Sequence, residues 1–302
     1  MKNIVVILAV IAAGCSSVPA HDAPFAFSTE HFDVAAADPQ QARRLAAHGE
    51  ATWRLFADEL GVSPPRARLV LVDGIGDGLY EPGRVIVDAS ADPGVLRHEI
   101  AHHFVAALLG SVPDWLNEGL AEYLQSVRVV EGRPVVSGLA AIHLDRILTG
   151  AQAPACRRRH ADYTSSWWAV ARLIEEGSGS LRERILALKG RTAPAGSAWR
   201  PPVRWEHELA ETLATDRDGF ARAAAARILA RLGRLDALRD AVAGETSVGV
   251  RAVIAAELAR AGEKQPLRDL LPEIECLHAL ALVSRSAGRG FDSVDDLRRW
   301  LE

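Results

Sequence analysis

Residues 93–109 constrain the fold most, because their apolar residues recur at helical spacing until Gly110 ends the pattern. Within this segment His98 and His102 are four residues apart, so a helix carries both imidazoles on one face, one turn apart. The fold must therefore bury one side of this helix while two imidazoles face a common point, where they can share one cation. The apolar positions are Val95, Leu96, Ile100, Phe104, Leu108 and Leu109.

Glu99 completes the pattern His-Glu-x-x-His and indicates what such a cation would do. A catalytic zinc ion takes three protein ligands and leaves a fourth position for water, so His98 and His102 can supply two of the three. Glu99 is too close in sequence to complete the set, but it is well placed to accept a proton from the water as a general base. The pattern alone is a weak signal, and its weight depends on a third ligand elsewhere in the chain.

A second helical segment, from Asp114 to about Val127, holds the candidate third ligand. Fifteen residues separate Glu118 from His102. Glu118 shares the polar side of this segment with Glu122, so packing of the two helices can bring the carboxylate of Glu118 to the metal. The apolar side is expected to bury Trp115, Leu116, Leu120 and Leu124.

Together, the stretches HEIAHHF and WLNEGLAEY resemble the gluzincin metallopeptidases, in which a glutamate from a second helix completes His-Glu-x-x-His. The resemblance covers about residues 26–200. The arrangement of the motifs is similar to the WLNEGxAxY element of the aminopeptidase-like branch and to compact bacterial members of the peptidase MA clan. It implies hydrolysis of peptide bonds, with Zn2+ as the cofactor and Glu99 in catalysis. The zinc ligands that it implies are His98, His102 and Glu118. The ligand spacing is shorter than in the aminopeptidases and no GAMEN-like segment is present, so aminopeptidase specificity is not implied.

Two supporting residues are suggested by the same resemblance and by the chemistry of imidazole ligands. Glu122 matches the acid that accepts the free N–H of the first histidine and so fixes its tautomer, with a solvated helix glutamate as the alternative. Tyr163 is the candidate oxyanion donor, for which His143 or His160 could substitute; a half-buried packing tyrosine is the alternative. His103 points about 100° away from its neighbour and is expected on the helix surface.

Patterns of other enzyme classes are missing from the sequence. A metzincin needs glycine and histidine where this chain has Val105 and Leu108. A serine hydrolase would need a GxSxG nucleophile elbow, and a cysteine hydrolase would need a reactive cysteine near a histidine. The sequence contains neither pattern. The glycine-rich segment DGIGDGLYEPG lacks the GxxxxGK[ST] pattern, so we expect a turn between strands rather than a phosphate loop.

Spacing along the chain predicts an α+β fold, with a small N-terminal sheet followed by helices. The strand Val85–Asp88 is expected to lie beside an extended substrate. A Pro/Gly/Arg-rich stretch at 190–204 marks the end of a mostly helical metallopeptidase-like domain at 26–200. Strands are expected at 25–35, 66–73 and 84–88, and helices at 40–60, 139–148, 162–176 and 180–189.

The last third of the chain contains an internal repeat, because residues 222–242 recur 29 residues later at 251–271. Such a period resembles short bacterial HEAT-like repeats, each of which is a pair of helices. We therefore expect an all-α repeat domain at 205–302, capped by residues 288–301, with a surface that binds a protein partner. A plain helical bundle with accidental similarity is the alternative.

The first fifteen residues resemble a bacterial lipoprotein signal peptide, with one cation, an apolar run and the sequence Ala12-Ala13-Gly14-Cys15. A lipid on Cys15 would attach the chain to a membrane, facing the periplasm or anchored at the outer membrane, with residues 16–25 as a linker. An uncleaved anchor or an ordinary cleavage is the alternative. Of the remaining cysteines, Cys156 and Cys276, separate thiols are favoured over a disulfide.

Net charge excludes one further class of partner. The 35 basic and 39 acidic residues are interleaved and leave a net charge of -4, so nucleic acid is not an expected partner. Two functions remain. The first is an exported zinc peptidase acting on a peptide or protein, and the alternative is a non-catalytic cell-envelope binding protein with a metallopeptidase-like core.

Overall fold

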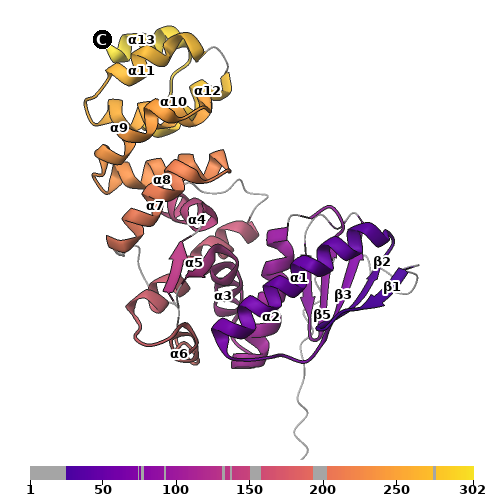
Figure 1. Ribbon diagram of the computed structural model, residues 1–302. Coiled ribbons are helices and arrows are strands. Elements are labelled where there is room, and N and C mark those ends of the chain that lie inside the picture. The colour runs from indigo at the N-terminus through magenta and orange to yellow at the C-terminus, as the bar shows by residue number, and fades with distance from the viewer. Residues whose placement is uncertain are drawn as a thin grey trace, which may run out of the picture.

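The computed structural model describes residues 25–73, 75, 78–91, 93–130, 133–136, 138–149, 158–192, 203–274 and 277–302. Over these residues the chain has the expected α+β class, with a sheet near the N-terminus and helices over most of the rest (Figure 1). The expected signal peptide and nearly all of the linker lie outside the described residues, as do Cys15, Cys156 and Cys276. None of the described helices is long and apolar enough to cross a membrane.

Five short strands form one sheet in the order β1-β2-β3-β5-β4 (Figure 1). β1 is antiparallel to β2, β3 is parallel to both β2 and β5, and β4 returns antiparallel along β5. Apolar residues of neighbouring strands, such as Leu69 and Val85, pair in register and are fully buried, which fixes the face that the helices cover. The strands are β1 (Phe25–Ser28), β2 (Phe32–Ala36), β3 (Ala67–Val72), β4 (Gly78–Glu81) and β5 (Arg84–Asp88).

Three expectations that concern the sheet are wrong. Residues 25–35 are not one strand, because the polar residues 29–31 turn the chain and separate β1 from β2. The glycine-rich segment 73–83 is not only a turn, because it contains β4, which pairs with β5. The strand Val85–Asp88 therefore has neighbours on both sides and cannot add a substrate strand, whereas β4 is an edge of the sheet.

The first helix, α1 (Pro39–Leu60), packs against β2 and α2 and agrees with the helix predicted at 40–60. Asp38 caps its first turn by accepting a hydrogen bond from the backbone N–H of Gln40, and Gly61 ends it with a left-handed φ of 56°. Trp53 is fully buried, with its ring edge-on to Phe104 at a centroid distance of 5.0 Å. This aromatic contact holds α1 against α2.

The helices that follow agree with the sequence to within a few residues, and a hairpin of β6 and β7 between α3 and α4 was not predicted. α2 packs on β4, β5 and α3, and α3 packs closely on α5. A side chain at Gly119 would collide with the backbone carbonyl of Ser166, so glycine permits this approach of α3 to α5. The elements are α2 (Pro93–Leu109), α3 (Asp114–Ser126), β6 (Val127–Val130), β7 (Arg133–Val136), α4 (Gly138–Thr149), α5 (Arg158–Glu176) and α6 (Leu181–Leu186).

The C-terminal part is helical throughout its described residues (Figure 1). α8 and α10 have 13 residues each and begin 29 residues apart. Arg222 of α8 pairs with Glu245, and Arg251, at the corresponding position of α10, pairs with Glu273. One apolar core runs from the sheet to α8 and α10, and a smaller one lies among α10 to α13. The helices are α7 (Val203–Thr215), α8 (Gly219–Arg231), α9 (Leu235–Gly244), α10 (Val248–Arg260), α11 (Gln265–Leu270), the 3-10 helix η2 (Leu271–Glu273), α12 (Leu277–Ala287) and α13 (Val294–Leu301).

Candidate metal centre

Three of the candidate ligands converge at the contact between α2 and α3. Oε2 of Glu118 lies 3.4 Å from Nε2 of His98 and 3.5 Å from Nε2 of His102, and the two Nε2 atoms are 3.1 Å apart. Both histidines are buried, and the side chain of Glu118 is 30% exposed. Three ligand atoms thus point at one position, with a route for solvent along the carboxylate.

These separations suit a small divalent ion. Metal bonds of about 2.0–2.1 Å at tetrahedral angles place two ligand atoms about 3.4 Å apart, which is close to the three distances observed. Although it is buried, Oε2 of Glu118 accepts no hydrogen bond from the described residues. A buried carboxylate oxygen without a donor is costly, and a cation at this position would compensate it. His98, His102 and Glu118 could therefore hold a metal ion.

The local sequence explains why these side chains meet. Gly110 ends α2 with a φ of 72° and Pro113 precedes α3, so the chain reverses over a few residues and lays α3 against α2. Leu116 and Leu120 of α3 are fully buried on the apolar side. That burial leaves Glu118 on the side of α3 that faces the histidines.

Electrostatic interactions in this cluster favour charged groups. Burial lowers the pKa of the His98 imidazole, but the carboxylates of Glu118, Glu122 and Glu99 outweigh burial and raise that pKa to about 9. Burial raises the pKa of Glu118, but the imidazoles of His102 and His98 outweigh burial and lower it to about 2. The carboxylate of Glu118 is thus ionised across the neutral range, as a metal ligand must be.

Carboxylate and amide groups surround the outer nitrogen of His98. Nδ1 of His98 lies 3.5 Å from Oε1 of Glu122 and 3.3 Å from Oε1 of Gln125. Both are acceptors, so Nδ1 carries a proton. When a metal binds, the proton on Nε2 is released and the lone pair of Nε2 is free for the ion, while Nδ1 stays protonated. The other oxygen of Glu122 lies 2.9 Å from Nε2 of His143, which is buried in α4. The structure thus brings Glu122 to the position predicted for it, and sequence reasoning missed Gln125 and the pairing of His143.

Glu99 lies against the edge strand β4. A Cβ atom added to Gly78 would stand 2.6 Å from Cγ and 2.8 Å from Oε1 of Glu99, so the glycine leaves the space that this side chain occupies. Glu99 is itself buried on α2, next to His98. The candidate base therefore lies between the ligand helix and the open edge of the sheet.

His103 is not on the helix surface as predicted, because it is buried with 5% of its surface exposed. Its Nε2 donates to the backbone carbonyl of Pro65 at 2.8 Å, and its Nδ1 accepts from the Tyr80 hydroxyl at 3.1 Å. Burial lowers the pKa of His103, which agrees with a neutral ring. The ring of Tyr80 in turn stacks near His102 at a centroid distance of 6.0 Å. No sequence pattern pointed to Tyr80, which forms a wall of the site.

The predicted oxyanion donors are only partly placed. Tyr163 and His160 belong to α5, but their side chains lie outside the described residues. His143 is held by Glu122 and its ring stacks on Trp167 at 5.3 Å. The hydrogen bond to Glu122 gives His143 a role in the surroundings of His98 instead.

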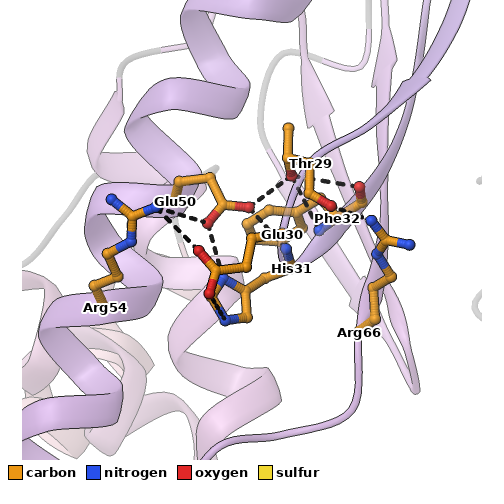
Figure 2. Close-up of polar contacts among 7 residues, drawn as sticks. All are labelled: Thr29, Glu30, His31, Phe32, Glu50, Arg54 and Arg66. Carbon is orange, nitrogen blue, oxygen red and sulfur yellow. Dashed lines mark hydrogen bonds and ion pairs between the residues drawn. The ribbon is translucent and has the colours of Figure 1, made fainter.

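A second histidine and carboxylate cluster lies where the turn between β1 and β2 meets α1 (Figure 2). Oε2 of Glu50 lies 2.8 Å from Nδ1 of His31, while its Oε1 accepts from the backbone N–H of His31 and from the hydroxyl of Thr29. The guanidinium of Arg54 lies 3.1 Å from Glu30. Because both oxygens of Glu50 are engaged and an arginine already supplies positive charge, this cluster fastens the turn to α1 and has no need of a metal.

Comparison of the chain with protein-family models and with curated proteins found no match. The functional assignment therefore depends on the geometry of the metal centre and on the resemblance of its motifs.

Proposed function

We propose that this chain is a zinc-dependent peptidase of the gluzincin kind. The observation that carries the proposal is the convergence of His98, His102 and Glu118 at separations that suit a tetrahedral ion, with Glu99 beside them. Two imidazoles and one carboxylate with an open fourth position are the ligand set of many catalytic zinc sites. The motif resemblance favours a peptide bond over other amides as the substrate.

Each residue of the centre then has a defined task. Zinc, when bound, supplies a Lewis acid that polarises the scissile carbonyl and makes water more acidic. Glu99 takes the proton from the attacking water and returns it to the leaving amine nitrogen. Glu122 keeps Nδ1 of His98 protonated, so that the lone pair stays on Nε2. Tyr163 remains the candidate donor to the oxyanion.

The substrate is proposed to lie along β4. Among the described strands, β4 pairs with β5 alone, and the side chain of Glu99 packs against its first residue, Gly78. An extended peptide that adds to the edge would place its backbone next to the base. Leu79 of β4 is 48% exposed and offers an apolar contact to such a peptide.

The C-terminal helices are proposed to be HEAT-like repeats that bind a protein partner. Support comes from the 29-residue offset of α8 and α10, and from the ion pairs that the corresponding residues Arg222 and Arg251 make with Glu245 and Glu273. From the sequence of residues 1–15 we propose that the protein is exported and attached to a membrane through a lipid on Cys15.

The test compares Glu99→Gln with Glu211→Gln, a matched change at an exposed position of α7. Zinc content and cleavage of a peptide library are measured on both variants and on the unmodified chain. Glu99→Gln should retain one zinc ion per chain and lose cleavage by a factor of at least about 100, while Glu211→Gln behaves as the unmodified chain. Cleavage by Glu99→Gln at the full rate would remove Glu99 from the mechanism. Zinc binding without cleavage by the unmodified chain would favour the non-catalytic binding protein.

A further inference from the structure

Helix α4 lies between the metal centre and the C-terminal helices (Figure 1). Its most extensive packing is against α8, and it also touches α3, α5 and α7. Two polar residues of α4, His143 and Asp145, are buried, and they are two positions apart, so they point to different sides of the helix. Each of them pairs with a different part of the molecule.

On the side of the metal centre, His143 completes a chain of contacts to a ligand. Its Nε2 lies 2.9 Å from Oε2 of Glu122, and Oε1 of the same carboxylate lies 3.5 Å from Nδ1 of His98. Because a carboxylate accepts, Nε2 of His143 is the donor. The His143 ring is itself fixed by stacking on Trp167 at 5.3 Å and 20°. His143 therefore sets the rotamer of the carboxylate that orients His98.

On the other side, a buried ion pair fastens α4 to α8. Nε of Arg227 lies 2.9 Å from Oδ1 of Asp145, and its Nη2 lies 2.7 Å from Oδ2, so the guanidinium engages both oxygens. At the start of α4, a Cβ added to Gly138 would collide with the carboxylate of Asp216, which lies between α7 and α8, and would stand 2.6 Å from Cβ of Ala221 in α8. The position of α4 is thus determined by close contacts with the C-terminal helices.

We propose that α4 couples the C-terminal helices to the metal centre, with His143 as the positioning residue at its inner end. This inference rests on the proposed zinc site but not on its catalytic activity. A shift of α8, such as one caused by a partner bound to the C-terminal helices, would move α4, release Glu122 from His143 and change the affinity of the site for zinc. The C-terminal region is then a regulator of the centre as well as a binding surface.

The first experiment measures zinc affinity by competition with a chromophoric chelator, and the visible spectrum of the Co2+-substituted chain. His143→Leu removes the donor and should weaken zinc binding about 10-fold, the lower end of the range for residues that support metal ligands. His143→Gln keeps an N–H donor at the same reach and should restore most of the affinity and the Co2+ spectrum. His207→Leu, at an exposed position of α7, is the matched control and should change neither.

The second experiment tests the coupling with a double-mutant cycle. Gly138→Ala pushes α4 away from α8 and should weaken zinc binding several-fold in the unmodified chain, but have no further effect when combined with His143→Leu. Arg227→Lys, which keeps the charge and loses the two-pronged contact, provides a milder perturbation if Gly138→Ala does not fold. Fully additive effects, or unchanged zinc affinity in His143→Leu, would overturn the coupling alone. A chain that binds no zinc would overturn the proposed function together with it.

Discussion

The contact between Gly78 and Glu99 allows the candidate base to be displaced without changing any metal ligand. In Gly78→Ala the new Cβ would begin 2.6 Å from Cγ of Glu99 and 2.8 Å from Cγ1 of Val95. Carbon atoms pack at about 3.5–4.0 Å, so the strand and these side chains must separate by about 1 Å. Rotation of the carboxylate alone cannot relieve the contact, because Cγ is close to the backbone, and Val95 is stiff at its branched carbon.

The expected effect follows from this displacement. A misplacement of about 1 Å near the reacting atoms can lower a rate about 100-fold, so kcat/KM for a peptide cleaved by the unmodified chain should fall by that factor. The free energy of unfolding should fall by about 1–3 kcal/mol from overpacking. Zinc affinity should change little, because the three atoms nearest to the new Cβ belong to Glu99 and Val95 and not to the metal ligands.

The assay combines steady-state kinetics, zinc content and chemical unfolding of purified variants. Gly244→Ala is the matched control, because a Cβ at that position meets nothing within 4 Å. A folded Gly78→Ala chain with unchanged kcat/KM would refute the placement of Glu99 as the base. An equal loss in Gly244→Ala would also refute the reasoning, because it would show that the effect is not local.

Three further predictions concern buried and half-buried polar groups. Burial raises the pKa of Glu257 to about 7 from 4.5, so between these values the folded chain keeps a proton that the unfolded chain has lost, and stability falls as pH rises. Glu257→Gln should therefore raise the free energy of unfolding in urea by up to about 3 kcal/mol at pH 8 and change little at pH 4; a loss of stability at pH 8 would contradict this. Burial raises the pKa of Glu50, but hydrogen bonds from Thr29 and His31 outweigh burial and lower the pKa below its usual 4.5. The ionised carboxylate therefore stabilises the folded chain above pH 4.5, and this contribution is lost as the pH falls through the lowered pKa. Glu50→Gln should cost about 1–3 kcal/mol at pH 7 in the same assay, with a cost that shrinks in acid, and a constant cost would exclude the ionised carboxylate as its source. Tyr80→Phe removes the donor to the buried His103 and should cost about 1–2 kcal/mol in thermal unfolding, whereas an unchanged Tm would show that this hydrogen bond is not made.

The helices could be predicted from the sequence, because their apolar residues recur at regular spacing. The apolar spacing of residues 93–109 requires a helix, and that helix puts His98 and His102 on one face without any knowledge of the rest of the chain. Glu118 could also be predicted. The short connection lays α3 against α2, and burial of the apolar side of α3 leaves few orientations for its polar side. These inferences use local geometry alone.

Contacts between distant segments were not readable in the same way. β4 has four residues and begins with a glycine, and it becomes a strand because β5 offers it a partner. Helical spacing alone predicted His103 on the surface. In the fold, Tyr80 and Pro65 from other segments form hydrogen bonds with both ring nitrogens of His103, and spacing cannot predict such contacts. The pairing of His143 with Glu122 likewise depends on how α4 packs, which no spacing rule describes.

Central to the account is the claim that one metal ion is held by two histidines of α2 and one glutamate of α3. It is tested most directly by titrating zinc into the unmodified chain, Glu118→Ala and Glu50→Ala, and measuring stoichiometry and affinity. We expect one tight site per chain, weakened more than about 100-fold in Glu118→Ala and unchanged in Glu50→Ala, whose carboxylate belongs to the other histidine cluster. Unchanged zinc affinity in Glu118→Ala, or loss of the site in Glu50→Ala instead, would contradict the claim.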